Sequence, residues 1–505
     1  MKLSRFTLKN ITSDQVVVPD ETIFDLPEKV LQFGTGVLLR GLPDYFIDQA
    51  NRKGIFNGRI VVVKSTTHGD TQAFDKQDGL YTLCIRGIED GIKKEENIIN
   101  ASISRVLSAA EEWEQILECA HNHHMQVIIS NTTEVGIQLV HDDVRHHPPK
   151  SFPGKLLAFL YERFKAFHGS ESSGMVIVPT ELIPDNGRKL EAIVLELAHL
   201  NGLEESFIDW LESSNHFCNS LVDCIVTGKP DAIVQANLEQ AFGYTDELLT
   251  MSETYRLWAI EGGQHVKEVL NFTQCNESVV IAPDIELFRE LKLRLLNGTH
   301  TLSCGLAFLA GCETVKQAMD DANVSAYISQ LMQDELANAI PYTVDFDAAQ
   351  AFGRKVLDRF RNPHINHLWL NITVQYSSKM RMRCVPLLIN HYHKIGTVPE
   401  LFAAGFAAYL LFMKGVSKVD EKVYGERSGV RYLIQDDQAP VMYKRWQSQS
   451  PAGVVKSTLG DIAFWGSDLS LLSGFQESVH QHLLSMIDKG VKGSLENIQI
   501  KKAVA

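Results

Sequence analysis

Short runs of β-branched and other apolar residues alternate with longer helical patterns through the first 230 or so residues. Each run ends at or near Gly, Ser or Thr, which is typical of a parallel sheet buried on both faces. The predicted strands are 29–34 (KVLQFG), 59–65 (RIVVVKS), 98–106 (IINASISRV), 126–132 (QVIISNT), 175–181 (MVIVPTE) and 223–228 (DCIVTG). This half is therefore predicted to be an α/β, doubly wound, Rossmann-like domain.

After about residue 284 the pattern changes to longer helical segments, with LNITVQY (370–376) as a strand-like exception. The predicted helices are 284–296, 300–311, 325–340, 347–361, 398–415 and 467–490. The stretches KGVSK (414–418) and SQSPAGV (448–454) are interpreted as loops within a domain. We therefore expect a dinucleotide-binding domain over 1–283 and a mainly helical substrate and catalytic domain over 284–505.

Composition narrows the class of protein. The chain has 505 residues, 45% of them hydrophobic and 22% charged, as in ordinary globular proteins. A net charge of -14 argues against general affinity for nucleic acid or anionic membranes. The longest apolar stretch, 401–413, is too short to cross a bilayer, and the N-terminus has no continuous apolar region of a secretory signal. Eight cysteines without a CxxC pair favour reduced thiols, so a cytoplasmic location is expected.

Gly34 and Gly36 follow the first predicted strand and precede a helical pattern. In a dinucleotide fold, one such glycine permits the tight turn and the next lets the pyrophosphate approach the backbone. The third glycine of GxGxxG is missing, because Leu39 stands there, so an ordinary strand-to-helix turn is the alternative. The second strand ends at Lys64, where an acid is usual, and Asp70 is the nearest candidate for the ribose hydroxyls. NAD is the expected cofactor, with NADP left open.

Three polar residues interrupt the apolar run LKLRLLNGTH. At about 100° per residue, Lys292, His300 and Asn297 project at about 0°, 80° and 140° on one side of a helix. A partly desolvated lysine can transfer a proton to or from a carbonyl oxygen, while asparagine and histidine polarise it. The alternative is that Lys292 is solvated and Asn297 with Gly298 ends one helix before another begins.

The sequence KLRLLNGTH resembles the KxxxxNxxH signature of the mannitol dehydrogenase family of long-chain, metal-independent polyol and sugar-acid dehydrogenases. Further similar segments run along the chain. They are Gly34, Gly36 and Arg40 (GxGxxxR), 77–82 (QDGLYT), 133–136 (TEVG), 184–187 (PDNG), Val222 with Asp223, and 361–363 (RNP). Leu38 and Leu39 replace a Phe-His pair of the family, and Cys224 replaces an arginine.

The resemblance implies roles for individual residues. Lys292 is expected to be the general acid/base, and Asn297 with Asn186 to hold the carbonyl oxygen. His300 and Asp223 are expected to orient hydroxyls. The residues expected to bind NAD are Gly34, Gly36, Arg40, Asp70, Thr133 and Glu134.

Several segments are most similar to the branch that interconverts D-tagaturonate and D-altronate: 37–48 (VLLRGLPDYFID), 130–136 (SNTTEVG), 178–187 (VPTELIPDNG) and 253–262 (ETYRLWAIEG). Fructuronate reduction or a mannitol-type polyol reaction in the same family is the alternative. A protein that binds NAD without catalysis is a third.

A sugar acid needs a counter-charge. Lys379, Arg381 and Arg383 stand at alternate positions, so on a strand they would share a face and bind a carboxylate. A solvated basic edge is the alternative. The family's C-terminal lysine corresponds to Lys379, and an upstream arginine is replaced near Asn371.

The histidine-rich stretches 121–124 (HNHH) and 141–147 (HDDVRHH) lack zinc-site spacing and are interpreted as surface loops. No metal is expected. The predicted partner is a small sugar acid, with no nucleic acid or membrane. The oligomeric state is left open, with a monomer as one alternative.

Overall fold

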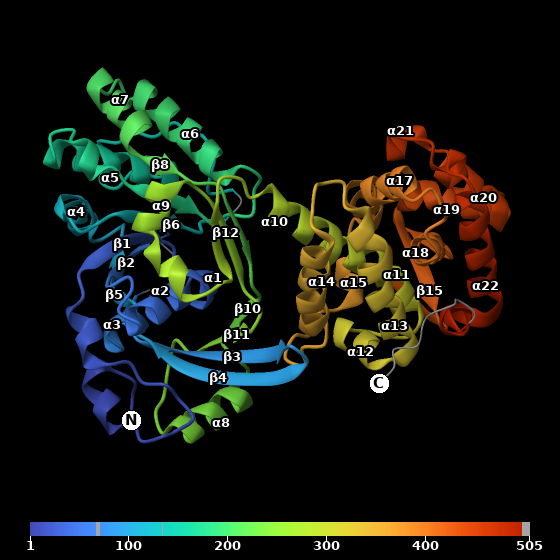
Figure 1. Cartoon of the computed structure of the whole chain (residues 1–505), viewed down its shortest axis with the longest axis horizontal. Helices are drawn as coiled ribbons and strands as arrows, with labels where there is room; N and C mark the ends of the chain where they lie inside the picture. Colours follow the sequence, from blue (N-terminus) through green and yellow to red (C-terminus); the bar gives the residue numbers. More distant parts are fainter. Residues whose placement is uncertain (67–70, 134, 497–505) are drawn as a thin grey trace. The chain divides into compact units, whose positions relative to one another are not determined.

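The structure is a computed structural model that describes residues 1–66, 71–133 and 135–496. The chain divides into two compact units. The first contains Met1–Gly87 and Lys93–Ile285, and the second contains Ile88–Ile92 together with the chain from Glu286 onward. In Figure 1 the first unit runs from blue to yellow-green, and the second from yellow to red together with the short blue segment 88–92.

A six-stranded parallel sheet forms the centre of the first unit, which confirms the predicted doubly wound fold. The strand order β5-β2-β1-β6-β7-β8 reverses direction between β1 and β6. In such sheets, ligands bind beyond the carboxyl ends of the strands at this reversal. The strands are β1 (Glu28–Phe33), β2 (Arg59–Lys64), β5 (Ile103–Ser108), β6 (Val127–Ser130), β7 (Val176–Pro179) and β8 (His216–Phe217).

Alternate residues of these strands pack into two different cores, as the two-residue period of a strand requires. Val30 and Val62 contribute to the core shared with α2 (Pro43–Arg52). Leu31 and Val63 contribute to the core shared with the helices on the other side of the sheet (Figure 1). Those helices are α4 (Trp113–Glu118), α5 (Phe152–Ala166), α6 (Asn186–Leu200) and α7 (Glu205–Ser214).

Two smaller sheets complete the first unit. One has the order β10-β11-β3-β4 and the other β13-β12-β9. Their strands are β3 (Tyr81–Glu89), β4 (Ile92–Asn100), β9 (Ser220–Asp223), β10 (Val226–Gly228), β11 (Thr250–Glu253), β12 (Leu257–Glu261) and β13 (Val279–Ala282). The remaining helical elements here are α1 (Val37–Gly41), α3 (Gln72–Lys76), α8 (Ala232–Phe242), α9 (Gln264–Val269), η1 (Arg5–Asn10), η2 (Glu21–Asp25), η3 (Cys119–His121), η4 (Glu171–Ser173) and η5 (Asn271–Cys275).

The predictions of single strands over 98–106 and 223–228 were wrong, because each segment divides between two sheets. In the first, β4 ends at Asn100, whose side-chain oxygen accepts hydrogen bonds from the Ser102 amide (2.9 Å) and hydroxyl (2.7 Å). This local bond turns the chain into β5. Turn chemistry thus overrides the apolar pattern.

The second unit is mainly helical around one apolar core, as predicted. Its centre is α18 (Glu400–Phe412), which packs against α11 (Gly298–Leu309) and α22 (Phe475–Leu495). The other helical elements are α10 (Glu286–Leu291), η6 (Lys292–Asn297), α12 (Val315–Asp320), α13 (Ala322–Gln330), η7 (Leu331–Leu336), η8 (Ala337–Ala339), α14 (Phe346–Phe360), α15 (Trp369–Ile372), α16 (Tyr376–Lys379), η9 (Met380–Cys384), α17 (Val385–Lys394), α19 (Ala439–Ser448), α20 (Pro451–Leu459), α21 (Ile462–Trp465) and η10 (Leu469–Leu471). Within the described part of the chain, no helix has the length and apolar character to cross a membrane.

The predicted strand 370–376 is wrong, because the segment lies in α15, a turn and the start of α16. Trp369 and Ile372 are buried at helical spacing in α15, and Tyr376 is buried at the start of α16, so packing of these two short helices outweighs the β-branched composition. The interpretation of 414–418 as a loop misses β14 (Ser417–Val419), the first strand of an antiparallel sheet. That sheet continues through β15 (Lys422–Arg427) and β16 (Val430–Leu433).

Candidate functional site

The glycine turn lies where the strand order of the central sheet reverses. Gly34 has φ +130°, and a Cβ at this position would lie 2.9 Å from Leu39 Cδ1 and 3.0 Å from the Asn131 carbonyl oxygen. Only glycine is accommodated there without strain. Gly36 is the N-cap of α1, and a Cβ on it would meet nothing within 4 Å. The backbone at Gly36 is therefore accessible to a ligand at the edge of β1 and β6.

Arg40 makes its described contacts inside the first unit. Its Nη1 donates to the Leu248 carbonyl oxygen over 2.7 Å, and the guanidinium lies over the rings of Phe74 and Tyr81. Burial lowers the pKa of Arg40. These contacts fix α1 against the neighbouring sheet, and a contact of Arg40 with a cofactor stays a prediction.

The loop after β6 contains Thr133, which adopts φ +92°, an unusual conformation for a β-branched residue. Glu181, which sequence reasoning missed, holds this loop. Its carboxylate accepts from the Thr132 amide (2.8 Å) and hydroxyl (3.0 Å) and from the Ser130 hydroxyl (3.1 Å). An acidic residue two positions past the end of β7 was the available signal. The other cofactor candidates in these loops, Asp70 and Glu134, lie outside the described residues.

Asn186 lies beside β9, and Asp223 belongs to that strand. Asn186 is buried at the start of α6, and its Nδ2 lies within 3.0 to 3.1 Å of the carbonyl oxygens of Pro179, Glu181 and Ser220. Its Oδ1 accepts from the Gly187 and Ser220 amides. Asp223 is the buried last residue of β9. The Asn186 amide therefore joins β7, α6 and β9, and its contact with a substrate oxygen stays a prediction.

Lys292, Asn297 and His300 lie on one continuous helical run, α10–η6–α11. The alternative in which Asn297 and Gly298 end a helix is wrong, because Gly298 is helical (φ −64°, ψ −47°). The α-helical angles expected for this segment are also wrong, because η6 is π-helical. A π-helical turn closes over five residues, so Asn297 lies about one turn above Lys292. His300 follows three residues later, on the next turn.

His300 is 92% buried among aromatic rings of the second unit. Its ring stacks on Phe360 at 4.2 Å and meets Trp369 edge to face at 5.9 Å. No described residue forms a hydrogen bond with its Nε2. Burial lowers the pKa of His300 well below its usual value, and four neighbouring basic groups lower it further. They are His367, Arg359, Arg383 and Lys379.

The predicted cation strand is wrong in its geometry, because Lys379 ends α16 and Arg383 lies in the π-helical η9. Alternate residues of a helix point to opposite sides, whereas residues four apart share a face. Lys379 and Arg383 therefore lie together, while Arg381 is exposed. Lys379 Nζ donates to the Ile372 carbonyl oxygen (2.9 Å), and Arg383 Nη1 donates to Thr301 Oγ1 (3.3 Å). Burial lowers the pKa of both groups.

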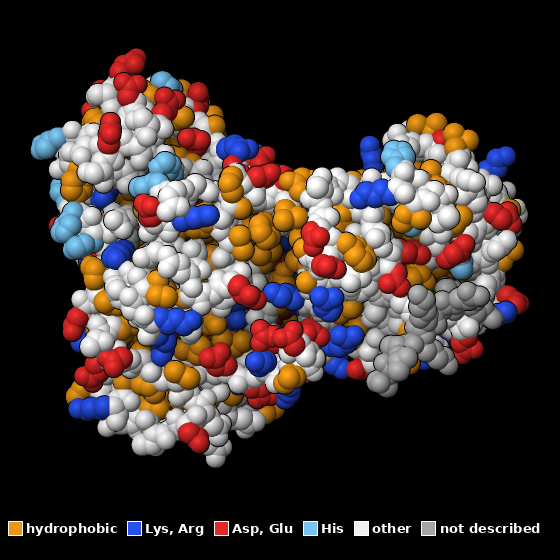
Figure 2. Space-filling model, in the orientation of Figure 1, with side chains coloured by type: hydrophobic (Ala, Val, Ile, Leu, Met, Phe, Trp, Pro, Cys, Tyr) orange, Lys and Arg blue, Asp and Glu red, His pale blue; other side chains and the backbone are white. Residues whose placement is uncertain are grey.

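The histidine-rich segments lie on the first unit. Figure 2 shows several exposed histidines on the side that carries α4 and α5. His121 pairs with Glu162, and His147 pairs with Glu114, each at 2.9 Å. Among the described residues, no group of three or more His, Cys, Asp or Glu side chains is placed to hold a metal ion.

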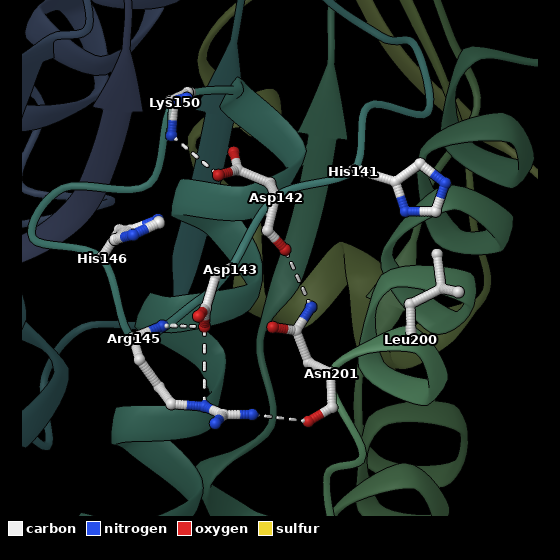
Figure 3. A pocket seen from close by; sticks show the side chains of 8 residues that line it. All are labelled: His141, Asp142, Asp143, Arg145, His146, Lys150, Leu200 and Asn201. Atoms are coloured by element: carbon white, nitrogen blue, oxygen red, sulfur yellow. Dashed lines mark hydrogen bonds and ion pairs between the residues drawn. The ribbon is translucent and has the colours of Figure 1, made fainter.

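A hollow of about 360 Å³ lies at the loop after 140 and contains none of the predicted site residues. In Figure 3 its polar groups face one another. Asn201 donates to the Asp142 carbonyl oxygen (3.0 Å), and Arg145 donates to that of Asn201 (3.0 Å). The hollow is lined by His141, Asp142, Asp143, Arg145, His146, Lys150, Leu200 and Asn201. These hydrogen bonds connect the loop to the C-terminal end of α6, so we interpret the hollow as part of the packing between the loop and this helix.

Comparison with known proteins covers both units. The mannitol dehydrogenase Rossmann domain model matches residues 28–274, and the mannitol dehydrogenase C-terminal domain model matches residues 284–487. Altronate oxidoreductase of Bacillus subtilis (strain 168) is 36% identical over 481 residues, covering 94% of this chain and 96% of the relative. Altronate oxidoreductase of Escherichia coli O7:K1 is 35% identical over 475 residues, covering 92% of this chain and 96% of the relative.

Solved structures share the fold at lower identity. The ternary complex of Pseudomonas fluorescens mannitol 2-dehydrogenase with NAD and D-mannitol is 22% identical with a TM-score of 0.64, covering 98% of this chain and 99% of that one. D-Sorbitol dehydrogenase in substrate-free form is 20% identical with a TM-score of 0.77, covering 98% of this chain and 100% of that one. The two family models and the relatives with more than 30% identity place this chain in the mannitol dehydrogenase family, as an oxidoreductase of the polyol or sugar-acid type that acts on CH–OH groups.

Proposed function

We propose that the protein interconverts D-tagaturonate and D-altronate with NADH and NAD as the coenzyme pair. The proposal rests first on relatives named altronate oxidoreductase, which are similar over more than nine-tenths of the chain. The basic groups around His300 in the second unit also support an anionic substrate, because a carboxylate is stabilised by nearby cations.

A dinucleotide fits the glycine turn of the first unit. Gly34 makes the sharp turn that a larger residue would obstruct, and Gly36 leaves its backbone open to a phosphate. Gly34, Gly36 and the loop that carries Thr133 are the described residues that would hold the coenzyme. When bound, reduced nicotinamide supplies the hydride that the ketone carbon accepts.

Lys292 is assigned the proton transfer. Its ammonium group donates a proton to the ketone oxygen as the alcohol forms, and the amine takes a proton from the hydroxyl in the reverse reaction. Asn297, one turn above, donates a hydrogen bond to the same oxygen and stabilises its developing negative charge. Lys379 and Arg383 bind the carboxylate of the sugar acid.

The buried His300 Nε2 is the observation that carries the proposal. A buried polar atom without a protein partner costs free energy unless a ligand or water satisfies it. It lies on the same helical run as Lys292 and Asn297 and beside cations. Its neutral ring can accept from, or donate to, a substrate hydroxyl.

The test follows NADH oxidation with tagaturonate, fructuronate and fructose in parallel, for the parent protein and Lys292→Met. We expect tagaturonate to give the highest kcat/KM and Lys292→Met to lower kcat at least about a hundredfold while NADH still binds. Preference for fructuronate or fructose would reassign the substrate within the family. Tight NADH binding without turnover of any of the three would indicate a non-catalytic NAD-binding protein, and unchanged kcat in the variant would exclude Lys292 as the proton donor.

A further inference from the structure

Arg294 joins two separate helical segments of the second unit. Its side chain is only 9% exposed, and its Nε lies 2.9 Å from Oε2 of Glu290, one turn earlier on the same helix. Its Nη1 donates to the carbonyl oxygens of Met382 (2.8 Å) and Arg383 (3.0 Å) in η9. One guanidinium therefore ties the helix that carries Lys292 to the segment that carries Arg383.

These carbonyl oxygens lie just before a proline inside a helical run. Helical residues extend from Tyr376 to Lys394 through η9, and Pro386 occupies the first turn of α17. Proline has no N–H, so the carbonyl of Met382, four residues earlier, lacks its α-helical donor. The π-helical turn of η9 immediately precedes this break. Arg294 supplies a charged donor to that carbonyl, and such bonds are stronger than neutral ones.

Arg294 is on a different side of its helix from Lys292, because residues two apart on a helix point in nearly opposite directions. Thr301, seven residues after Arg294 on the same helical run, faces η9 as well. There its hydroxyl accepts a hydrogen bond from Arg383 Nη1 (3.3 Å). Three hydrogen bonds, two from Arg294 and one to Thr301, thus hold η9 along this helical run.

We propose that Arg294 is a positioning residue that fixes the proline-interrupted turn, and with it Lys379 and Arg383, relative to the helix of Lys292. The inference rests on the proposed function, in which the two cations bind the carboxylate and the amine transfers the proton. The carboxylate and the ketone of one substrate are then bound by two helical segments, and the spacing between these segments decides whether both groups can bind at once. A small displacement of η9 lowers turnover as well as affinity, because reacting groups must be held in register.

The first experiment measures amide hydrogen exchange in the full-length protein without substrate. In Arg294→Met we expect exchange at residues 380–388 to be about tenfold faster than in the parent, because η9 loses its link. Arg294→Lys keeps a hydrogen-bond donor, so its exchange rate at 380–388 should lie between those of the parent and Arg294→Met. Exchange in β14, β15 and β16 should not change. Unchanged exchange at 380–388 would overturn the structural link, whether or not the protein reduces a keto-uronate.

The second experiment measures tagaturonate kinetics per folded enzyme. Arg294→Met should raise KM about tenfold or more and lower kcat, with the Kd for NADH within about twofold of the parent. Arg445→Met, which removes a partly buried ion pair with Asp461 between α19 and α21, is the matched control. It should lower Tm without changing KM. Equal KM values for Arg294→Met and the parent would overturn the proposal.

A third variant tests the role of the proline. Pro386→Ala restores an N–H that can bond the Met382 carbonyl oxygen, so Arg294→Met with Pro386→Ala should recover part of the lost affinity and slow the exchange at 380–388. Pro386→Ala alone serves as the reference. If the double variant has the same KM and the same exchange at 380–388 as Arg294→Met, then Arg294 does not replace the N–H that Pro386 lacks, and that explanation fails.

Discussion

His300 stacks on Phe360 with ring centroids 4.2 Å apart and planes inclined by 15°. The stack fixes the plane of the imidazole and leaves its Nε2 buried without a hydrogen bond from any described residue. A rigid, neutral imidazole can discriminate hydroxyl positions on a sugar, because a misplaced group leaves that nitrogen unsatisfied. The Phe360 ring is therefore expected to matter for turnover as well as for stability.

Phe360→Leu removes this stack. We expect a stability loss of about 1–3 kcal/mol and a kcat for tagaturonate reduced by about tenfold or more, because the imidazole is no longer held in one plane. Phe412→Leu is the control, since Phe412 stacks on Tyr432 at 4.8 Å within the same core. Thermal unfolding and steady-state kinetics compare the two. Equal kcat values for these variants would show that the stack only stabilises the fold.

His300 is expected to stay neutral while the enzyme works. Because burial lowers its pKa in the folded state, unfolding exposes a group that binds a proton more readily. The stability that this burial contributes is present above the usual pKa near 6.5 and falls as pH decreases below it. The ratio of kcat for the parent and His300→Gln should therefore be constant between pH 6 and 8. An inflection near pH 6.5 that disappears in His300→Gln would contradict a neutral imidazole.

Lys379→Met should raise KM for tagaturonate about tenfold to a hundredfold, because it removes a cation from the expected carboxylate site. Arg381→Met is a matched control two residues away, on the exposed side of the helix. It should change KM by less than about twofold. Measuring both at several salt concentrations checks the charge dependence. Similar KM increases in the two variants would favour a general field effect over a binding site.

Gly34 and Gly36 should respond differently to alanine. Gly34→Ala places a Cβ against Leu39 and the Asn131 carbonyl oxygen at φ +130°, and should cost about 1–3 kcal/mol of stability. Gly36→Ala meets no neighbour, so its Tm should stay near that of the parent. Its Kd for NADH should still rise about tenfold, because the methyl group occupies the space expected for the pyrophosphate. Fluorescence titration with NADH measures this. Normal NADH binding by Gly36→Ala would place the coenzyme elsewhere.

Glu335 predicts a pH-dependent stability in the second unit. Its carboxylate accepts from the Leu401 (2.9 Å) and Phe402 (2.8 Å) amides at the start of α18, and burial raises its pKa to about 7. A raised folded-state pKa stabilises the protein below the usual value of 4.5, and this contribution is lost as pH rises through about 7.

The variant Glu335→Gln removes the titrating group. The free energy of unfolding of the variant minus that of the parent should rise by up to about 3 kcal/mol as the pH increases from 5 to 8. Urea unfolding at several pH values measures the difference. A difference that does not change with pH would show that Glu335 keeps one protonation state throughout this range.

Much of the fold is readable from local patterns. The four strands β1, β2, β6 and β7 each contain a short apolar run that ends at or next to Gly, Ser or Thr, and this pattern predicts a buried parallel strand without knowledge of its neighbours. The apolar stretch that became α18 is likewise buried on all sides. Patterns fail where side-chain bonds or packing act against them, as at Asn100 and in 370–376.

Some residues of the candidate site can likewise be identified from the sequence, and others only from the folded structure. Lys292, Asn297 and His300 can be found from the sequence, because spacing along one helix is a local property. Arg294, Glu181 and Phe360 carry no signal strong enough to separate them from ordinary helix or strand-end residues. Their contacts join segments that are far apart in the chain, so only the folded structure assigns them a role.

The amino-acid sequence by itself determined the parallel sheet, the helical second half and the helix on which the three polar residues stand, because each follows from the periodicity of neighbouring residues. Tertiary structure decided the π-helical turns, the helical rather than extended course of the segment with Lys379, and the aromatic surroundings of His300. These depend on packing and hydrogen bonds between distant segments, which outweigh local propensity when a buried polar group or an unpaired carbonyl must be satisfied.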